Sequence, residues 1–534
     1  MPPIIAFLLF LLAWAAGSSL AQEPPFELLI TGGQIVDGSG NAWYRADLGI
    51  RGGRIAAIGA LRGRPTKRTI DARNHVVAPG FVDMMGNSSE PLLLDRSSAE
   101  SKLRQGITTM LAGEGASAAP SAKWPAFSAY FRALESAGIP INVIHNVGAA
   151  QVRRQVIGEE NRPPNEPELA KMRALVDQAM KDGAVGLSTA LIYPPGTYAT
   201  TTELVEMAKV AGRYGGIYMT HMRNESGGVL EAITESIRIG REAGVPVHIF
   251  HLKAAGQENW PLMQRAVDMI QGARDLGLDV TADIYPYIRN GLGLIALIHP
   301  RHFGKGAEPF LKTLARPEVR ASLRQEIEST SDWENWYRHV GSDWNNILVA
   351  SVGAGLDKSY EAKSIAEIAK LRGADEWSAF FDLAATDSVS VNPKSMNEEQ
   401  KNLAFRTEWV SLCTDAPPTP LTATGAHPRA FGAFPRVLAQ YVRQEHVLSM
   451  ESAVRKMSSL AANRLGLYDR GRIAPGLAAD LVIFNPQTVK DVASFEKPLA
   501  FPKGIPHVIV NGVAVIDAGR FTGDNPGRVL RYRR

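Results

Sequence analysis

The chain has 534 residues, a formal net charge of +4, and 21% charged and 45% hydrophobic residues. No long basic run accompanies this small excess of positive charge, so the composition disfavours a nucleic-acid partner and is typical of a globular protein. The length allows two or more domains. The single cysteine, Cys413, excludes an intramolecular disulfide.

The N-terminal segment differs from the rest of the chain. Residues 4–16 form an apolar stretch, and small residues follow it up to Ala21. This pattern is typical of a signal peptide, residues 1–21, cleaved after Ala21. The stretch is short for a transmembrane span. We therefore expect an exported protein, located in a bacterial periplasm and without a membrane span in the mature chain, with a retained N-terminal anchor as the alternative.

The two ends of the remaining chain have similar patterns. Alternating apolar residues and glycine turns in residues 26–78 indicate β-hairpins. Residues 479–484 and 506–516 have the same alternation. We expect residues 26–78 and 467–534 to pair into one small β domain, a β-sandwich, with the larger domain inserted between them.

Between residues 78 and 416 we expect eight strands. They are the apolar runs at residues 80–85, 106–112, 140–147, 184–190, 217–222, 245–252, 279–287 and 409–414. Helical patterns lie in most of the gaps, so the sequence predicts an α/β fold, a (β/α)8 TIM-type barrel over residues 79–466. The gap at residues 292–407 is too long for one crossover and predicts an inserted lid or subdomain.

Two neighbouring predicted strands end in a histidine. His221 and His251 each close an apolar run, and each is followed two residues later by a cation, Arg223 or Lys253. In parallel β/α arrays the carboxyl ends of the strands carry the chemistry. We expect both histidines at the mouth of the barrel, although each on its own could be an ordinary polar residue at a strand end.

Carboxylates follow two other predicted strands. Glu114 comes after the second strand and Asp415 after the eighth. One carboxylate with two imidazoles, here Glu114, His221 and His251, is a ligand set that catalytic zinc uses, with a fourth position left for water. Asp415 is then a candidate general base and acid. The alternatives are that Glu114 caps a turn and that Asp415 caps a helix.

Further side chains near these strand ends could bind a substrate. Arg223, Lys253, Tyr285 and Arg289 offer donors for a carboxylate, and Tyr193 is a candidate for lining a pocket. The alternatives are that the cations are solvated charges and that Tyr193 packs a loop.

The residues that carry these patterns resemble the amidohydrolase superfamily, and within it the D-aminoacylase (N-acyl-D-amino-acid deacylase) family. The resemblance covers nearly all of the mature chain. Its most specific pieces are residues 78–83, 186–196, 220–223, 283–287, 427–436 and 469–480. It implies a zinc site in a (β/α)8 barrel flanked by a small β domain built from both chain ends.

The resemblance also implies roles for particular residues. His221 and His251 match the family's zinc ligands on strands five and six, and Asp415 matches its catalytic aspartate. Lys253 and Tyr285 fall where family members hold the substrate carboxylate.

Two departures of this sequence from the family concern the metal site, and a further change, at residues 289–291, stands where relatives often carry a serine near the substrate. Met85 and Asn87 replace the His-x-His pair that usually ends strand one, and Glu114 replaces a cysteine ligand. The chain is similar to a subset that lacks the pair, and Glu114, His221 and His251 still provide three ligands. We therefore expect one zinc ion per chain.

The function that the resemblance implies is hydrolysis of the amide of N-acyl-D-amino acids to a carboxylate and a free D-amino acid. The expected nucleophile is metal-bound hydroxide, with Asp415 as general base and acid. Two alternatives remain: hydrolysis of another C–N bond, in a dipeptide or cyclic amide, and a non-catalytic periplasmic binding protein.

Overall fold

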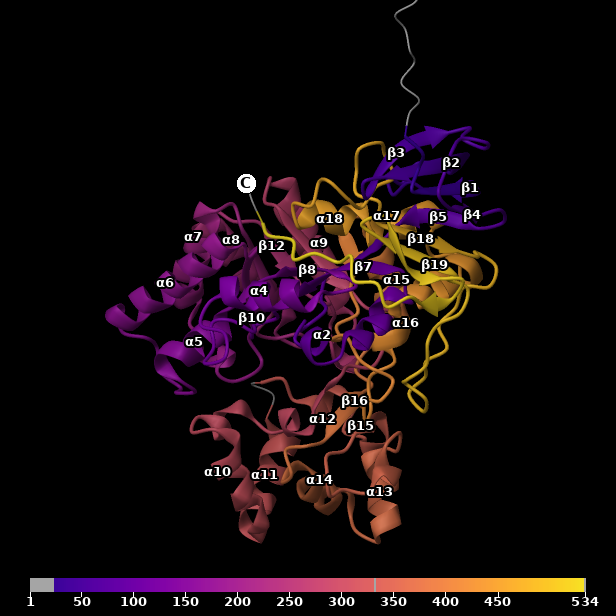
Figure 1. Cartoon of the computed structure of the whole chain (residues 1–534). Helices are drawn as coiled ribbons and strands as arrows, with labels where there is room; N and C mark the ends of the chain where they lie inside the picture. The colour runs from indigo at the N-terminus through magenta and orange to yellow at the C-terminus, as the bar shows by residue number, and fades with distance from the viewer. Residues whose placement is uncertain (1–23, 331–332, 533–534) are drawn as a thin grey trace, which may run out of the picture.

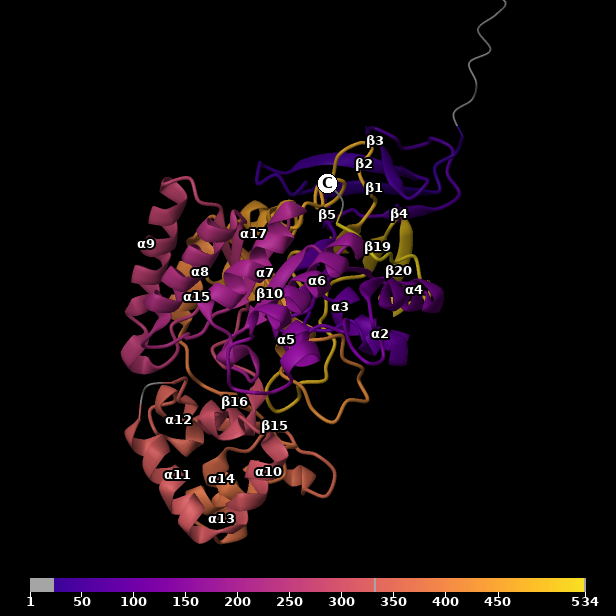
Figure 2. The same cartoon turned by 90° about the vertical axis from the view of Figure 1, so that its left-hand side faces the viewer.

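A computed structural model describes residues 24–330 and 333–532 (Figure 1). A β-sheet lies at one end of the molecule, a β/α region forms the middle, and a mostly helical segment lies at the other end (Figures 1 and 2). The predicted signal peptide, residues 1–21, lies outside the described residues. Within the described part of the chain, no helix combines the length and apolarity needed to cross a membrane.

The terminal sheet contains strands from both ends of the chain. Its order is β21-β20-β19-β18-β5-β1-β2-β3, with β4 paired to β1. The N-terminal strands are β1 (Leu28–Ile35), β2 (Tyr44–Arg51), β3 (Arg54–Gly59), β4 (Thr69–Asp71) and β5 (Val76–Pro79). The C-terminal strands are β18 (Leu481–Phe484), β19 (His507–Val510), β20 (Val513–Asp517) and β21 (Arg520–Phe521). The two sets meet where β5 and β18 pair antiparallel.

These strands form one continuous hydrogen-bonded sheet rather than the two separate sheets of a sandwich. Alternation along the strands divides their side chains between two faces. Ile30, Leu48 and Leu481 belong to a small separate core. Val482 and Val508 instead join the large core that continues into the β/α region. The sheet is thereby fixed against the middle of the molecule.

All eight apolar runs predicted as barrel strands contain a parallel strand. They are β6 (Phe81–Asp83), β7 (Ile107–Ala112), β8 (Asn142–His145) with β9 (Val147–Gly148), β10 (Gly186–Ala190), β11 (Ile217–His221), β12 (Val247–Ile249), β13 (Val280–Ile284) and β17 (Val410–Leu412). They form a three-stranded sheet, β6-β7-β8, and a six-stranded sheet, β17-β13-β12-β11-β10-β9. Only Asn146 separates β8 from β9, and the Met84 amide donates to the Leu412 carbonyl at 3.3 Å. The two sheets therefore adjoin at both edges.

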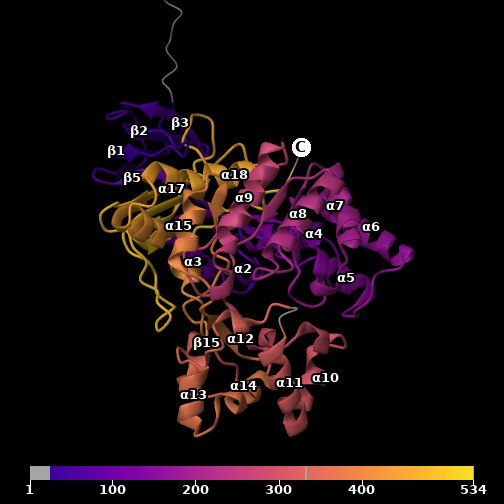
Figure 3. The ribbon, with the colours of Figure 1, turned by 180° about the vertical axis from the view of Figure 1, so that it is seen from behind.

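Helices alternate with these strands and cover their outer side (Figure 3). They are α4 (Phe127–Ala137), α5 (Ala149–Ile157), α6 (Glu166–Asp182), α7 (Thr201–Arg213), α8 (Val229–Ala243) and α9 (Leu262–Asp275), with shorter α2 (Pro91–Leu94) and α3 (Glu100–Leu103) near the start. Helix α8 buries Val229, Ile233 and Ser236 at helical spacing. Helix α6 begins at an Asn165–Glu168 capping box.

The long insertion forms a separate unit with its own core. It contains β14 (Leu292–Gly293), α10 (Ala307–Leu311), α11 (Pro317–Ser329), α12 (Trp336–His339), β15 (Ile347–Ser351), α13 (Ile365–Arg372), α14 (Glu376–Ala384) and β16 (Ser390–Pro393). Trp336, Trp344 and Trp377 pack in that core. The unit covers the carboxyl ends of the strands, as shown by the Gly256 amide, which donates to the Ser395 carbonyl at 2.8 Å.

The insertion predicted from the sequence, residues 292–407, also includes residues 398–406. They form α15 (Glu398–Arg406), which packs against α9 and β17. This helix precedes the last strand and continues the β/α alternation. The chain then continues through α16 (Arg429–Arg436), a π-helix η9 (Val437–Gln444), α17 (Met450–Met457) and α18 (Ser459–Arg464).

Candidate metal centre and active site

Glu114 is presented by a tight turn after β7. Its neighbours Gly113 and Gly115 both have positive φ, 93° and 60°. A Cβ at Gly113 would lie 2.5 Å from the Asn146 carbonyl oxygen, and one at Gly115 would lie 2.6 Å from the Ala190 amide nitrogen. Only glycine fits both positions. The Gly-Glu-Gly sequence therefore brings the backbone close to the next strands and directs Glu114 inward.

His221 and His251 occupy corresponding positions on adjacent strands. His221 is the last residue of β11, and His251 follows β12 by two residues. His251 has a φ of 36°, and its amide donates to Oδ1 of Asp283 at 2.7 Å. The other oxygen of Asp283 contacts Nε2 of His248 at 2.9 Å. Asp283 thus supports the backbone turn that orients His251.

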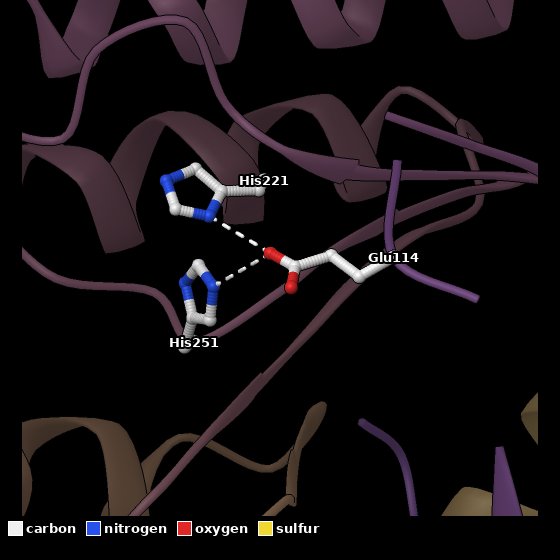
Figure 4. A group of neighbouring side chains, drawn as sticks. All are labelled: Glu114, His221 and His251. Atoms are coloured by element: carbon white, nitrogen blue, oxygen red, sulfur yellow. Dashed lines mark hydrogen bonds and ion pairs between the residues drawn. The ribbon is translucent and has the colours of Figure 1, made fainter. Parts of the chain in front are cut away.

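Glu114, His221 and His251 converge on one point (Figure 4). Oε1 of Glu114 lies 2.9 Å from Nδ1 of His221 and 3.6 Å from Nε2 of His251. The three potential ligand atoms all lie within 4.8 Å of one another, and both histidines are buried. A carboxylate and two imidazoles converging in this way fit a zinc ion with an open coordination position.

Glu225 contacts the same two histidines from the other side. Its Oε1 lies 2.9 Å from Nδ1 of His251, and its Oε2 lies 3.4 Å from Nε2 of His221. These are the ring nitrogens that do not face Glu114. A carboxylate against the second nitrogen of a metal-binding histidine fixes its tautomer and ring orientation. Glu225 therefore holds the His251 ring through Nδ1 and lies close to the ring of His221.

The charges around these residues favour a cation. Burial alone would raise the pKa of Glu114, but hydrogen bonds with His221 and His251 hold its pKa at about 2. Burial and Lys253 lower the pKa of His251, but Glu225 and other nearby carboxylates outweigh them and raise it to about 9. Glu114 therefore stays ionised, and the carboxylates around His251 stabilise positive charge at the point where the three side chains meet.

Asp415 lies beside this centre in a constrained backbone conformation. Its φ is 48°, and its Oδ2 is 2.5 Å from Nη1 of Arg429. Nδ2 of Asn87 lies 3.5 Å from Asp415 Oδ1 and 3.3 Å from Glu114 Oε2. Burial raises the pKa of Asp415, while Arg429 and His251 oppose that effect. Asn87 therefore links the candidate base to a metal-binding carboxylate.

A cluster of cations lies on the β12–β13 side of the centre. Lys253 is buried, and its Nζ is 2.6 Å from Oε1 of Glu225 and 2.7 Å from Nδ1 of His251. Nζ of Lys401 and the guanidinium of Arg429 lie 4.6 and 4.7 Å from the centroid of the Tyr285 ring. These groups are candidate donors for a carboxylate beside the candidate metal site.

The other predicted substrate-binding residues have different surroundings. The ring centroid of Tyr193 lies 5.5 Å from that of His221 in an edge-to-face contact. Arg223 donates to Glu235 at 2.9 Å and to the carbonyls of Thr197 and Ala199. Arg289 donates to two backbone carbonyls of the insertion, those of Asn346 and Asn392. The structure therefore places Tyr193 beside the centre, whereas both arginines are engaged in holding loops.

Sequence reasoning did not single out Glu225 or Arg429. Glu225 follows His221 by four residues and Arg223 by two. Arg429 lies within residues 427–436, a segment that was noted for its resemblance without a role for the arginine. Glu225 is a charged residue near a predicted strand end, whereas Arg429 begins helix α16, well after the last strand, and nothing local indicates the direction of either side chain.

Comparisons with known proteins agree with this geometry. The pattern of the Amidohydrolase family matches residues 68–516. A D-aminoacylase from Alcaligenes xylosoxydans xylosoxydans is 34% identical over 96% of this chain and 99% of its own length. An N-acyl-D-glutamate deacylase from the same organism is 34% identical over 96% of this chain and 97% of its own.

A solved structure extends the similarity to the fold. The N-acyl-D-glutamate deacylase from Bordetella bronchiseptica, complexed with zinc and a phosphonate mimic of the tetrahedral intermediate, superimposes with a TM-score of 0.82. It is 31% identical and covers 95% of this chain and 100% of its own. At this coverage and identity, this chain belongs to the amidohydrolase family and has its TIM-barrel-type fold with an additional domain.

Proposed function

We propose that this protein is a zinc-dependent hydrolase that cleaves the amide bond of N-acyl-D-amino acids. The observation that carries the proposal is the convergence of Glu114, His221 and His251 beside Asp415, with Lys253 and other cations on one flank. The similarity to D-aminoacylase and N-acyl-D-glutamate deacylase over nearly full length supports the substrate class and its D configuration.

Glu114, His221 and His251 would hold the zinc ion. A zinc ion at such a site acts as a Lewis acid towards a carbonyl and lowers the pKa of a water molecule. Glu225 keeps the two imidazoles oriented through their second nitrogens. Met85 and Asn87 stand where a second pair of histidines would be needed, and the Asn87 amide already contacts Glu114 and Asp415. These residues support one zinc ion per chain.

Asp415 carries the proton transfers in this proposal. As the carboxylate it accepts a proton from the attacking water and then donates it to the leaving nitrogen, so that the amine departs neutral. Arg429 and Asn87 contact its two oxygens and restrict its rotation. Its buried position keeps competing solvent away from the proton that it transfers.

The substrate carboxylate is bound on the flank opposite Tyr193. Lys253 and Arg429 supply positive charge there, and both lie within 6 Å of the centroid of the Tyr285 ring. An ion pair in a buried site positions the substrate as well as binding it, because both groups are removed from water.

We further infer the architecture around this site. The adjoining edges of the two parallel sheets support one closed barrel of eight strands. Residues 26–78 and 467–534 form the small β domain, and residues 79–466 form the barrel with its insertion. The N-terminal sequence pattern supports export to a periplasm after cleavage near Ala21.

The direct test uses paired N-acetyl-D- and N-acetyl-L-amino acids with purified, zinc-loaded protein. Release of free amino acid from the D series only, abolished by a chelator and restored by zinc, is the expected result. Hydrolysis of neither series by protein that binds zinc would contradict the proposal and shift attention to dipeptides and cyclic amides.

A further inference from the structure

A cavity of about 890 Å³ lies between the barrel loops and the insertion. The loop after β10 contributes Ile192 and Tyr193, and the insertion contributes Ile295, Ala296 and further residues. Tyr193 is shared with the candidate metal centre, because its ring packs edge-on against His221. Tyr193 therefore both lines the cavity and packs against a candidate metal ligand.

The position of the cavity relates it to one part of the substrate. The carboxylate-binding cations lie beside His251, whose ring centroid is 6.3 Å from that of Tyr285. Tyr193 and the cavity lie instead beside His221, on the other flank of the centre. With the scissile amide between these flanks and the amino-acid carboxylate on the Tyr285 side, the acyl group extends past Tyr193 into the cavity.

The cavity walls are mostly apolar. Ile192, Ile295, Ala296, Phe303 and Trp333 line it. A site of this size takes ligands far larger than an acetyl group, since ligand cavities of about 300 to 1,000 Å³ enclose drug-sized molecules. Each methylene that enters such a cavity gains the free energy of removal from water.

The charged groups of the cavity disfavour an anionic acyl group. Its cation Arg223 already donates to Glu235 and to two backbone carbonyls. Glu231 and Asp387 add negative charge to the lining. A terminal carboxylate on the acyl chain would therefore meet mainly acidic side chains, since Glu159, Glu235 and Glu334 also line the cavity.

We propose that the preferred substrates carry a long or bulky apolar acyl group, of about eight carbons or more, which occupies this cavity. The inference rests on the proposed function and adds the acyl class to it. The acyl group is selected by apolar burial, whereas the amino-acid carboxylate is selected by charge.

The test is an acyl series on one amino acid: acetyl, butanoyl, octanoyl, dodecanoyl and succinyl derivatives of D-alanine, compared by kcat/KM. We expect kcat/KM to rise from acetyl to octanoyl by up to about fourfold per methylene. We expect the succinyl derivative to fall below the butanoyl one. Acetyl and octanoyl substrates cleaved equally well would overturn the acyl proposal and leave the proposed deacylase function intact.

Substitutions in the cavity lining test whether the acyl preference arises in this cavity. Ala296→Trp fills the cavity and should reduce the octanoyl-to-acetyl ratio of kcat/KM at least tenfold. Leu276→Trp, at an exposed position that does not line the cavity, is the matched control and should keep the ratio. Ile295→Arg, at a half-buried position, should shift preference from octanoyl towards succinyl. An unchanged ratio in both cavity variants would also overturn the proposal.

Two further outcomes are distinguishable. The value of kcat/KM could rise when the amino-acid side chain is lengthened and stay constant when the acyl chain is lengthened. In that case the cavity holds the side chain, and the acyl assignment is wrong. If zinc-loaded protein cleaves no member of the acyl series and none of the N-acetyl-D-amino acids, the proposed function itself fails.

Discussion

Glu225 and His251 are joined on the side of the imidazole that faces away from the metal-binding point. Oε1 of Glu225 lies 2.9 Å from Nδ1 of His251, while Nε2 of the same ring faces Glu114. Glu225 also reaches Nε2 of His221 at 3.4 Å. One buried carboxylate thus contacts two candidate ligands that come from different strands.

The first prediction concerns this orienting role. Glu225→Gln keeps the size of the side chain but removes its charge, so both rings lose their ionic partner. We expect zinc affinity to fall about 10- to 100-fold, measured by competition with a chromophoric chelator. Glu242→Gln, at a more exposed glutamate on α8, is the control. Unchanged affinity in Glu225→Gln would show that the contact is only structural.

The second prediction concerns proton transfer. Asp415→Asn preserves shape and can still contact Asn87 and Arg429, but it cannot accept a proton. We expect kcat to fall by about 10²- to 10⁴-fold, with zinc content and substrate affinity maintained. Metal analysis and isothermal titration with a substrate check the last two points. Near-normal turnover in this variant would remove Asp415 from the reaction.

The third prediction separates charge recognition from general packing. Lys253→Met removes an ammonium from the proposed carboxylate site, so binding should weaken for N-acetyl-D-amino acids but not for their C-terminal amides. The measured quantity is the KM of the N-acetyl-D-amino acid divided by the KM of its C-terminal amide. This ratio should approach one in the variant. Lys209→Met, at an exposed lysine on α7, should leave the ratio as in the parent. A parallel loss with both substrate forms would indicate damage to the site instead.

Lys401 provides a prediction about stability. Its Nζ is buried beside Sδ of Met396 at 3.1 Å and near the Tyr285 ring. Burial, with repulsion from Lys253, lowers the pKa of Lys401 from 10.5 to about 7. At a pH above the pKa of the unfolded state, the Lys401 amine is neutral in both the folded and the unfolded chain. The group then has no effect on how the free energy of unfolding depends on pH. As pH falls from about 10 towards 7, only the unfolded chain gains the proton, so the folded state is progressively destabilised.

Lys401→Met should therefore stabilise the protein increasingly as the pH falls through this window. The difference in the free energy of unfolding should reach roughly 4 kcal/mol near pH 7 and change little below it. Urea unfolding at several pH values between 7 and 10 measures it, with Lys209→Met as the control. A difference that does not vary with pH would place the effect in packing rather than in proton binding.

Local patterns were sufficient to predict much of this fold. Apolar runs located all eight strands because a buried parallel strand has a continuous apolar sequence between turn residues. The same reasoning placed His221 and His251 side by side, since equivalent positions on adjacent parallel strands lie at one edge of the sheet. The glycines on either side of Glu114 were visible in the sequence, but only the structure shows that their backbone angles and close approach to neighbouring strands require glycine.

Side-chain direction was not predictable in the same way. Arg223 and Lys253 both stand two residues after a histidine at a strand end. Arg223 nevertheless pairs with Glu235 on α8, whereas Lys253 pairs with Glu225, which contacts the two histidines. Each charge binds the partner that the folded chain brings close. Arg289 similarly donates to carbonyls of Asn346 and Asn392, which are 57 and 103 residues away in the chain.

The sequence by itself therefore located the eight strands and placed the candidate ligands Glu114, His221 and His251 at strand ends. Those features depend on local periodicity and on turn geometry. Only the tertiary structure decided that Glu225 orients the ligands, that Arg429 pairs with Asp415, and that the insertion encloses a large apolar cavity beside Tyr193. These features require side chains from distant segments to pack together, and their burial and partners exist only once the whole chain has folded.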